Sequence, residues 1–123
     1  MQDRLQFLKH KDSEYFLIDL TSADRKEILN LLTEIQDIVT QKPRGSVLIL
    51  ADFNGAQIDK AVATRIKEVL VFDRPFVKRA AWVGTEKLPN VFYQGFKQFS
   101  QRDFPKFDSR EQALEWLVAS PTP

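Results

Sequence analysis

The sequence predicts a single α/β domain whose sheet is mixed but mostly parallel, and three observations lead to this class. The chain has 123 residues, which is the usual size of one domain. Hydrophobic residues make up 43% of it and charged residues 28%, as is typical of a folded globular protein. Along the chain the hydrophobic period alternates between that of a strand and that of a helix. This alternation indicates strands joined by helices, about four helices in all.

The first elements are expected to be a β-hairpin and an amphipathic helix. Residues 4–9 and 14–20 flank a polar turn, and the second run is almost continuously apolar, so both of its faces should be covered. Thr21 and Ser22 then offer N-caps for a helix. The apolar side chains of this helix recur at helical spacing: Ile28, Leu31, Leu32, Ile35 and Val39. The helix should end before Pro43.

The central strand is expected over residues 46–51, the most hydrophobic run of the chain. Within it, Leu48–Leu50 should be nearly free of solvent. A turn over residues 52–55 leads to a second helix, and strand character returns over residues 77–83. The apolar stripe of the second helix comprises Ile58, Val62, Ile66 and Val69.

A third helix is expected with Pro89 in its first turn. Its apolar stripe comprises Leu88, Phe92, Phe96 and Phe99. A short extended piece, Phe104–Phe107, precedes the last helix, whose start is marked by overlapping capping boxes at Asp108 and Ser109. The tail, residues 119–123, should be frayed. Residues 1–123 are thus expected to form one domain with its core over about 4–118.

Composition excludes several classes of function and selects none. The sequence has no cysteine and a single histidine, so disulfides, thiolate zinc sites and histidine clusters are excluded. That histidine, His10, lies in the charged hairpin and is expected to be exposed to solvent. A formal net charge of +1 gives no global attraction to nucleic acid. With no signal-peptide pattern and no membrane-length apolar run, we expect a cytoplasmic protein without catalytic residues, metal or cofactor.

Three stretches of the chain carry a family resemblance. Residues 41–50 run from the end of a helix directly into the central strand. Asp52–Asp59 contains a carboxylate and a small polar residue before a glycine and an Ile-Asp pair. Phe107–Leu117 contains the start of the last helix. In this order and spacing they resemble the STAS domains, the superfamily of the anti-sigma-factor antagonists. The similarity is greatest to the small single-domain branch called stage II sporulation AA-like proteins.

This resemblance implies a STAS-like fold and a non-catalytic regulatory module that docks an unidentified protein partner. The implied surface is the loop and the start of the second helix: Asp52, Asn54, Gly55, Asp59 and Lys60. In the anti-sigma antagonists, a serine that a kinase phosphorylates follows the Ile-Asp pair. Here the matching residue is Lys60, which has no hydroxyl. The nearest hydroxyl, that of Thr64, should face away from the helix start. We therefore expect no kinase control at this helix.

Two alternatives stay open. Asp19 and Asp52 should end neighbouring strands at the edge where ligands of open α/β sheets bind, with Thr85 and Lys87 nearby. Such a set suggests a phosphoaspartate receiver that uses magnesium, although the paired carboxylate and the late lysine of a receiver are missing. Aspartate is also common at strand ends as a turn former, and this interpretation is favoured. The other alternative is a module of the same fold that binds a small molecule or a lipid.

Aromatic residues are frequent, with ten phenylalanines in the chain. Most of those near the C-terminus lie at helical spacing and are expected to fill the core. Tyr93, Phe104 and Phe107 remain for solvent or a partner, so they form the candidate self-association patch of a homodimer. The low net charge offers no repulsion against such pairing.

Overall fold

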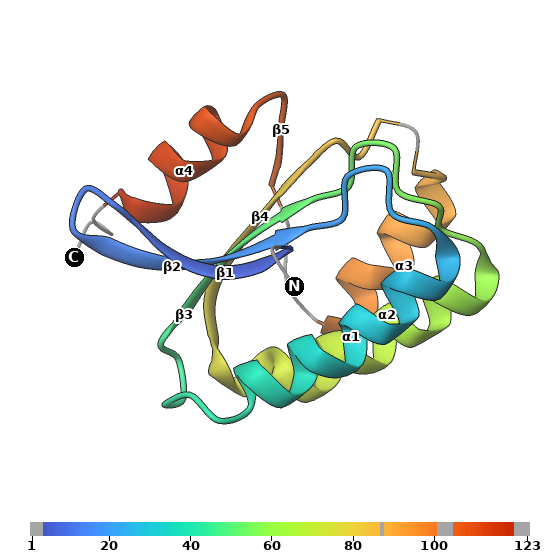
Figure 1. Ribbon diagram of the computed structural model, residues 1–123, viewed down its shortest axis with the longest axis horizontal. Helices are drawn as coiled ribbons and strands as arrows, with labels where there is room; N and C mark the ends of the chain where they lie inside the picture. Colours follow the sequence, from blue (N-terminus) through green and yellow to red (C-terminus); the bar gives the residue numbers. More distant parts are fainter. Residues whose placement is uncertain (1–3, 87, 101–104, 120–123) are drawn as a thin grey trace.

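The computed structural model describes residues 4–86, 88–100 and 105–119. It contains one five-stranded sheet with the strand order β1-β2-β3-β4-β5 and helices on both faces (Figure 1). The elements, in chain order, are β1 (Leu5–His10), β2 (Ser13–Asp19), α1 (Arg25–Val39), β3 (Val47–Asp52), α2 (Lys60–Asp73), the 3-10 turn η1 (Arg74–Phe76), β4 (Val77–Val83), α3 (Asn90–Ser100), β5 (Lys106–Phe107) and α4 (Arg110–Val118).

The sheet is mixed, as the sequence predicted. β1 and β2 form the antiparallel opening hairpin, and β2, β3, β4 and β5 run parallel to their neighbours. The hairpin turn has Lys11 at φ 50° and Asp12 at φ 68°. Two successive residues with positive φ are the geometry of a type I′ turn, whose twist matches that of the flanking strands. The predicted α/β class with an opening hairpin is therefore confirmed.

Helices cover both faces of the sheet, so its strands are apolar on both sides. In Figure 1, α1, α2 and α3 lie on one face and α4 on the other. Ile49 packs with the core cluster of the first face, and Leu50, completely buried, packs with the cluster beneath α4. Ile35, Ile66 and Trp82 belong to the same cluster as Ile49.

One prediction for the central strand is wrong. Leu48 was expected to be nearly free of solvent, but it is only half-buried. It lies on the face that α4 covers, where it packs at the margin of the smaller cluster. The nine-residue α4 is too short to cover the whole of this face, since it spans about 14 Å at the rise of an α-helix.

The N-cap predicted from the sequence is confirmed for α4 and wrong for α1. Ser109 caps α4, because its hydroxyl accepts a hydrogen bond from the Gln112 N–H at 3.2 Å. For α1 the predicted caps, Thr21 and Ser22, are wrong. Asp24 caps this helix instead, with its Oδ1 2.8 Å from the Glu27 nitrogen.

The aromatic core centres on Trp82. Its ring lies 4.8 Å from that of Phe53 and 5.6 Å from that of Phe96, measured between centroids. Phe96 is completely buried, which confirms the stripe at that residue. Leu88 precedes α3 rather than lying in it, and the side chain of Phe99 is outside the described part of the chain.

His10 is not the solvated turn residue that the sequence predicted. It is the last residue of β1 and is half-buried, with its ring Nε2 2.7 Å from Glu115 Oε2 on α4. Lys11 Nζ donates to the other oxygen of the same carboxylate at 2.6 Å. Hydrogen bonds from Lys11 and His10 hold the pKa of the Glu115 carboxyl below its usual range. The hairpin is therefore tied to the last helix.

Of the helices in the described residues, none has both the length and the apolar character that crossing a bilayer requires.

Candidate functional site

The carboxyl ends of the parallel strands β2, β3 and β4 meet at one edge of the sheet, which we call the carboxyl edge. Asp19 and Asp52 are register partners there, as the sequence predicted. Backbone hydrogen bonds of 2.8–3.0 Å connect the loops that follow the strands: Leu20 to Asp52, Ser22 to Asn54, Phe53 to Val83, and Gln57 to Ala23. The loops therefore form one connected surface.

Two of these loops meet most closely at Asn54 and Gly84. Gly84 has φ 76°, and a Cβ added to it would lie 2.5 Å from both the backbone nitrogen and the Cγ of Asn54. Any larger residue would force the loops apart, so this position needs glycine. Gly55, at φ 73°, is the turn glycine that the sequence predicted, and it packs against Ser22.

Asp19 and Asp52 both form turns with their side chains. Asp19 Oδ1 accepts from the Thr21 N–H at 3.0 Å and from its hydroxyl at 2.6 Å. Asp52 Oδ1 accepts from the Asn54 N–H at 3.0 Å and from its side-chain amide at 2.8 Å. A carboxylate that bonds the backbone two residues on forms an Asx turn, which ends a strand. The geometry thus supports the interpretation favoured by the sequence, in which these aspartates are turn formers at strand ends.

A single arginine joins the two carboxylates. Arg110, the first residue of α4, donates from Nε to Asp52 Oδ2 at 2.7 Å, and its Nη2 lies 3.3 Å from Asp19 Oδ1. The Asp52 side chain is only 6% exposed, so this charge-assisted hydrogen bond satisfies a buried carboxylate. Arg4 also lies near Asp19, with 3.9 Å between its Nη1 and Asp19 Oδ1.

The arginine also shifts the proton equilibria of this cluster. Burial works to raise the pKa of Asp19, but hydrogen bonds from Thr21 and the Arg110 guanidinium bring it below its usual range. For Arg110, burial opposes the charged form, and its contacts with Asp52 and Asp19 outweigh this, so its pKa is raised. Asp19 and Arg110 are therefore charged and paired at neutral pH.

Asp59 and Lys60 begin α2 at the exposed side of the edge. Asp59 is the N-cap, since its Oδ1 accepts from the Val62 N–H at 2.8 Å. Its other oxygen, Oδ2, lies 2.6 Å from Arg25 Nε on α1. The hydrogen bond from Val62 and the contact with Arg25 hold the pKa of Asp59 below its usual range, although burial acts in the opposite direction. Lys60 is exposed beside it as the first residue of the helix.

A hollow of about 200 Å³ opens between the loop after β3 and the segment after β4. The residues that line it are mostly apolar: Phe53, Gly55, Ala56, Ile58, Gly84, Leu88 and Pro89. Gly55 and Pro89 are exposed, while Ala56, Ile58 and Leu88 are half-buried. Because the residues that line it are mostly apolar, the hollow can take an apolar group from outside. It is already formed, since its walls belong to loops that are fixed to one another.

The structure brings only some of the predicted site residues together at the surface. Asn54, Gly55, Asp59 and Lys60 are exposed along the carboxyl edge. Asp52 is 4% exposed and lies beneath them as a structural anchor. Arg110 was not among the residues predicted from the sequence. The sequence did contain a signal for it. Arg110 is a basic residue directly after the Ser109 cap, and the helix that begins there starts at the edge where two aspartates end strands.

The candidate self-association patch falls largely outside the described residues. The side chain of Tyr93 and all of Phe104 lie there, as does Lys87 of the receiver-like set. Phe107 is half-buried, with its ring centroid 5.9 Å from that of Trp116. Self-association through this patch stays a prediction.

The fold has been seen before in a solved structure. An uncharacterized protein of the DUF3478 family from Shewanella loihica PV-4, described as having a SpoIIAA-like fold, superposes with a TM-score of 0.71. The match covers 93% of this chain and 92% of the other, at 15% sequence identity. The chain therefore has a SpoIIAA-like fold of the STAS type. No protein-family model matches the sequence, and neither does any curated protein.

Proposed function

We propose that this chain is a non-catalytic interaction module that docks a partner protein on the carboxyl edge of its sheet. The observation that carries the proposal is the hollow of about 200 Å³, lined mostly by apolar residues, beside exposed polar residues. Protein interfaces are organised in this way, with a few side chains anchored in pockets and a polar rim around them. Here Asn54, Asp59 and Lys60 supply the rim.

The rigidity of the edge supports docking. The hydrogen bonds between the loops and the close packing of Asn54 on Gly84 fix the walls of the hollow before a partner arrives. A surface that is already ordered loses little conformational entropy on binding. An apolar side chain of the partner would enter the hollow, and polar groups of the partner would face Asp59 and Lys60.

The pairing of the acidic residues argues against the receiver-like alternative. A phosphoaspartate receiver needs carboxylates that are open to magnesium and to an incoming phosphoryl group. Arg110 instead contacts both Asp52 and Asp19, and Asp52 is almost fully buried. Adding magnesium and beryllofluoride should leave the amide chemical shifts around Asp52 unchanged. Saturable shifts that Asp52→Asn abolishes would support the receiver instead.

Site-specific photo-cross-linking would test the docking proposal. A photoreactive phenylalanine analogue in place of the exposed Gln57, beside the hollow, should cross-link one discrete protein in cells. The same analogue in place of Asp37, exposed near the end of α1, is the control and should not. Cross-links formed equally at both positions would contradict the proposal.

Affinity measurements with the purified partner give the sharper test. Ala56→Phe places a ring in the hollow and should weaken binding at least about tenfold, as expected for loss of an anchored contact. Ala61→Phe is the matched control, because Ala61 is exposed on α2 and does not line the hollow. Equal dissociation constants for the two variants would show that the hollow takes no part.

A further inference from the structure

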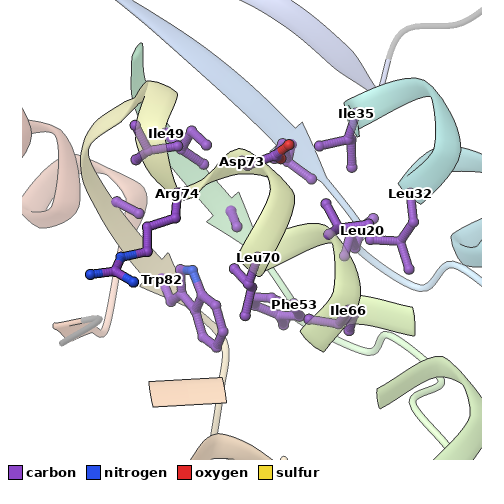
Figure 2. Close-up of a pocket in the computed structure, with 15 residues that line it drawn as sticks. Leu20, Leu32, Ile35, Ile49, Phe53, Ile66, Leu70, Asp73, Arg74 and Trp82 are labelled. Carbon is purple, nitrogen blue, oxygen red and sulfur yellow. The ribbon is translucent and has the colours of Figure 1, made fainter. Parts of the chain in front are cut away.

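A second cavity, of about 70 Å³, lies between the sheet and the helices α1 and α2. Figure 2 shows its walls, with Leu32 and Ile35 from α1, Ile66 and Leu70 from α2, and Trp82 from β4. It is separate from the hollow at the carboxyl edge in all but Phe53, which lines both.

One polar side chain is set among these apolar walls. Asp73, the last residue of α2, is only 4% exposed and lines the cavity. Its Oδ1 has no hydrogen-bond partner among the described residues. In Figure 2 its carboxyl group lies among the aliphatic side chains, while the exposed Arg74 points away from it. Buried polar atoms are nearly always hydrogen-bonded, because leaving one unpaired costs its desolvation, so this exception needs a physical reason.

We infer that this cavity binds a small branched aliphatic alcohol, whose hydroxyl pairs with the Asp73 carboxyl and whose carbons contact the apolar walls. This binding site is independent of the docking surface. A bound hydroxyl would supply the partner that Asp73 Oδ1 lacks. A water molecule is a poorer occupant, because a buried water usually makes about three hydrogen bonds and the walls are mainly apolar.

The protonation of Asp73 selects the chemical class. Burial raises the pKa of this carboxyl to about 8, and the charge of Arg65 offsets only part of that rise. At neutral pH it is therefore largely a neutral acid, with one donor and one acceptor to offer. A hydroxyl group complements both. An anionic ligand would bring an unpaired charge into an apolar site. An amine would enter as a cation, so Asp73 would have to lose its proton to pair with it there.

The volume of the cavity limits the size of the ligand. An engineered apolar cavity of about 150 Å³ accommodates benzene. At about 70 Å³ this cavity suits a molecule of about three to five heavy atoms. Isobutanol fits this limit and is the probe used below. Leu70 and Arg74 lie at the end of α2, and the exposure of Arg74 marks the side from which a ligand would enter.

Binding to the whole chain would be measured by NMR titration with three molecules that share one carbon skeleton. Isobutanol should give saturable amide shifts at Leu70 and Val77, with nuclear Overhauser contacts from its methyl groups to Ile35 and Ile49. Isobutylamine and isobutyrate should bind at least about tenfold more weakly, since each places a charge in the cavity. Absence of saturable shifts with isobutanol, or equal binding of all three, would overturn the inference.

Two substitutions distinguish the contribution of the hydrogen bond to binding from that of the cavity volume. Asp73→Asn keeps a donor and an acceptor of the same shape, so it should bind isobutanol within a few-fold of the original chain. Asp73→Ala enlarges the cavity but removes the polar partner, so binding should fall at least about tenfold. If the alanine variant binds isobutanol equally well, the site is merely an apolar void. If neither variant folds, the contacts and the three-ligand comparison on the original chain still decide the question.

Discussion

Asp19 and Asp52 show how single residues decide the chemistry of the carboxyl edge. They are register partners on adjacent parallel strands, and each bonds the backbone two residues further on. Two neighbouring carboxylates repel each other unless a cation lies between them. Arg110 supplies that cation from α4, at 2.7 Å from Asp52 and 3.3 Å from Asp19. The arginine therefore fixes the last helix to the edge and offsets part of the negative charge of the acidic pair.

Replacing Arg110 should destabilise the fold and free the acidic pair. We expect Arg110→Ala to lower the free energy of unfolding by about 1.5–3 kcal/mol, the usual value of a hydrogen bond to a charged group. Chemical denaturation would measure this loss. Arg110→Lys keeps the charge but not the planar fork, so it should recover only part of the stability. A loss of less than about 0.5 kcal/mol for the alanine variant would show that the pairing contributes nothing.

Asp73 should make stability fall as the pH rises from about 3.8 to about 8. Its pKa is about 8 in the folded chain, against an ordinary value of 3.8. Between these values the folded state keeps a proton that the unfolded chain has lost. The free energy of unfolding therefore falls with rising pH, by at most about 1.4 kcal/mol per pH unit from this group. Below pH 3.8 both states hold the proton, so the contribution of Asp73 to stability is fully present.

Asp73→Asn should remove this component, and the difference between variant and original chain isolates it from other titrating groups. Urea denaturation at both ends of the window would measure it. The variant should gain stability relative to the original chain as the pH rises. A constant difference in stability across the window would show that Asp73 is ionised in the folded state.

At the scale of elements, β3 is the clearest case of a strand covered unequally on its two faces. Leu50 is completely buried and Leu48 only half-buried, although both point toward the face that α4 covers. We expect Leu50→Ala to cost about 2–5 kcal/mol, the range for emptying a core site. Leu48→Ala should cost clearly less, because part of its surface already meets water. Denaturant titrations that rank the two variants in the opposite order would contradict this placement.

The same element shows what a sequence can and cannot predict here. The alternation of periods located the four longer strands, β1 to β4, since burial on a face imposes that period directly. The degree of burial of Leu48 could not be read in this way, because it depends on how far a helix from the other end of the chain extends. His10 is a similar case. Its partner, Glu115, lies on α4, so only the folded chain brings the two together.

The candidate site was predicted in part for a related reason. Asn54, Gly55, Asp59 and Lys60 follow one another closely in the chain, so a local pattern was sufficient to find them. Arg110 is far from them in sequence and reaches them only through the topology. Asp73 gave no signal, because an aspartate at the end of a helix is ordinarily exposed. Its burial follows from the packing of α2 over the sheet.

For the whole molecule, the exposed start of α2 should not be a phosphorylation switch. Lys60 has no hydroxyl, and the Thr64 hydroxyl, one turn further along, donates to the Lys60 carbonyl at 3.0 Å. Incubation with an anti-sigma-type kinase and ATP should therefore leave the intact mass unchanged. Lys60→Ser restores a hydroxyl at the helix start and is the positive control. A phosphate mapped to residues 58–64 of the original chain would show that Thr64 has replaced the serine.

The strand order β1-β2-β3-β4-β5 also has a consequence for synthesis on the ribosome. Each strand pairs with the one made just before it, so the sheet can grow in the direction of translation. Until residues 77–83 emerge, one side of the apolar β3 is an open edge that other chains could pair with. Stalled nascent chains that end before β4 should therefore recruit more chaperone than chains that extend past it. In the finished sheet β5 has only two residues, which leaves a short edge for unwanted pairing.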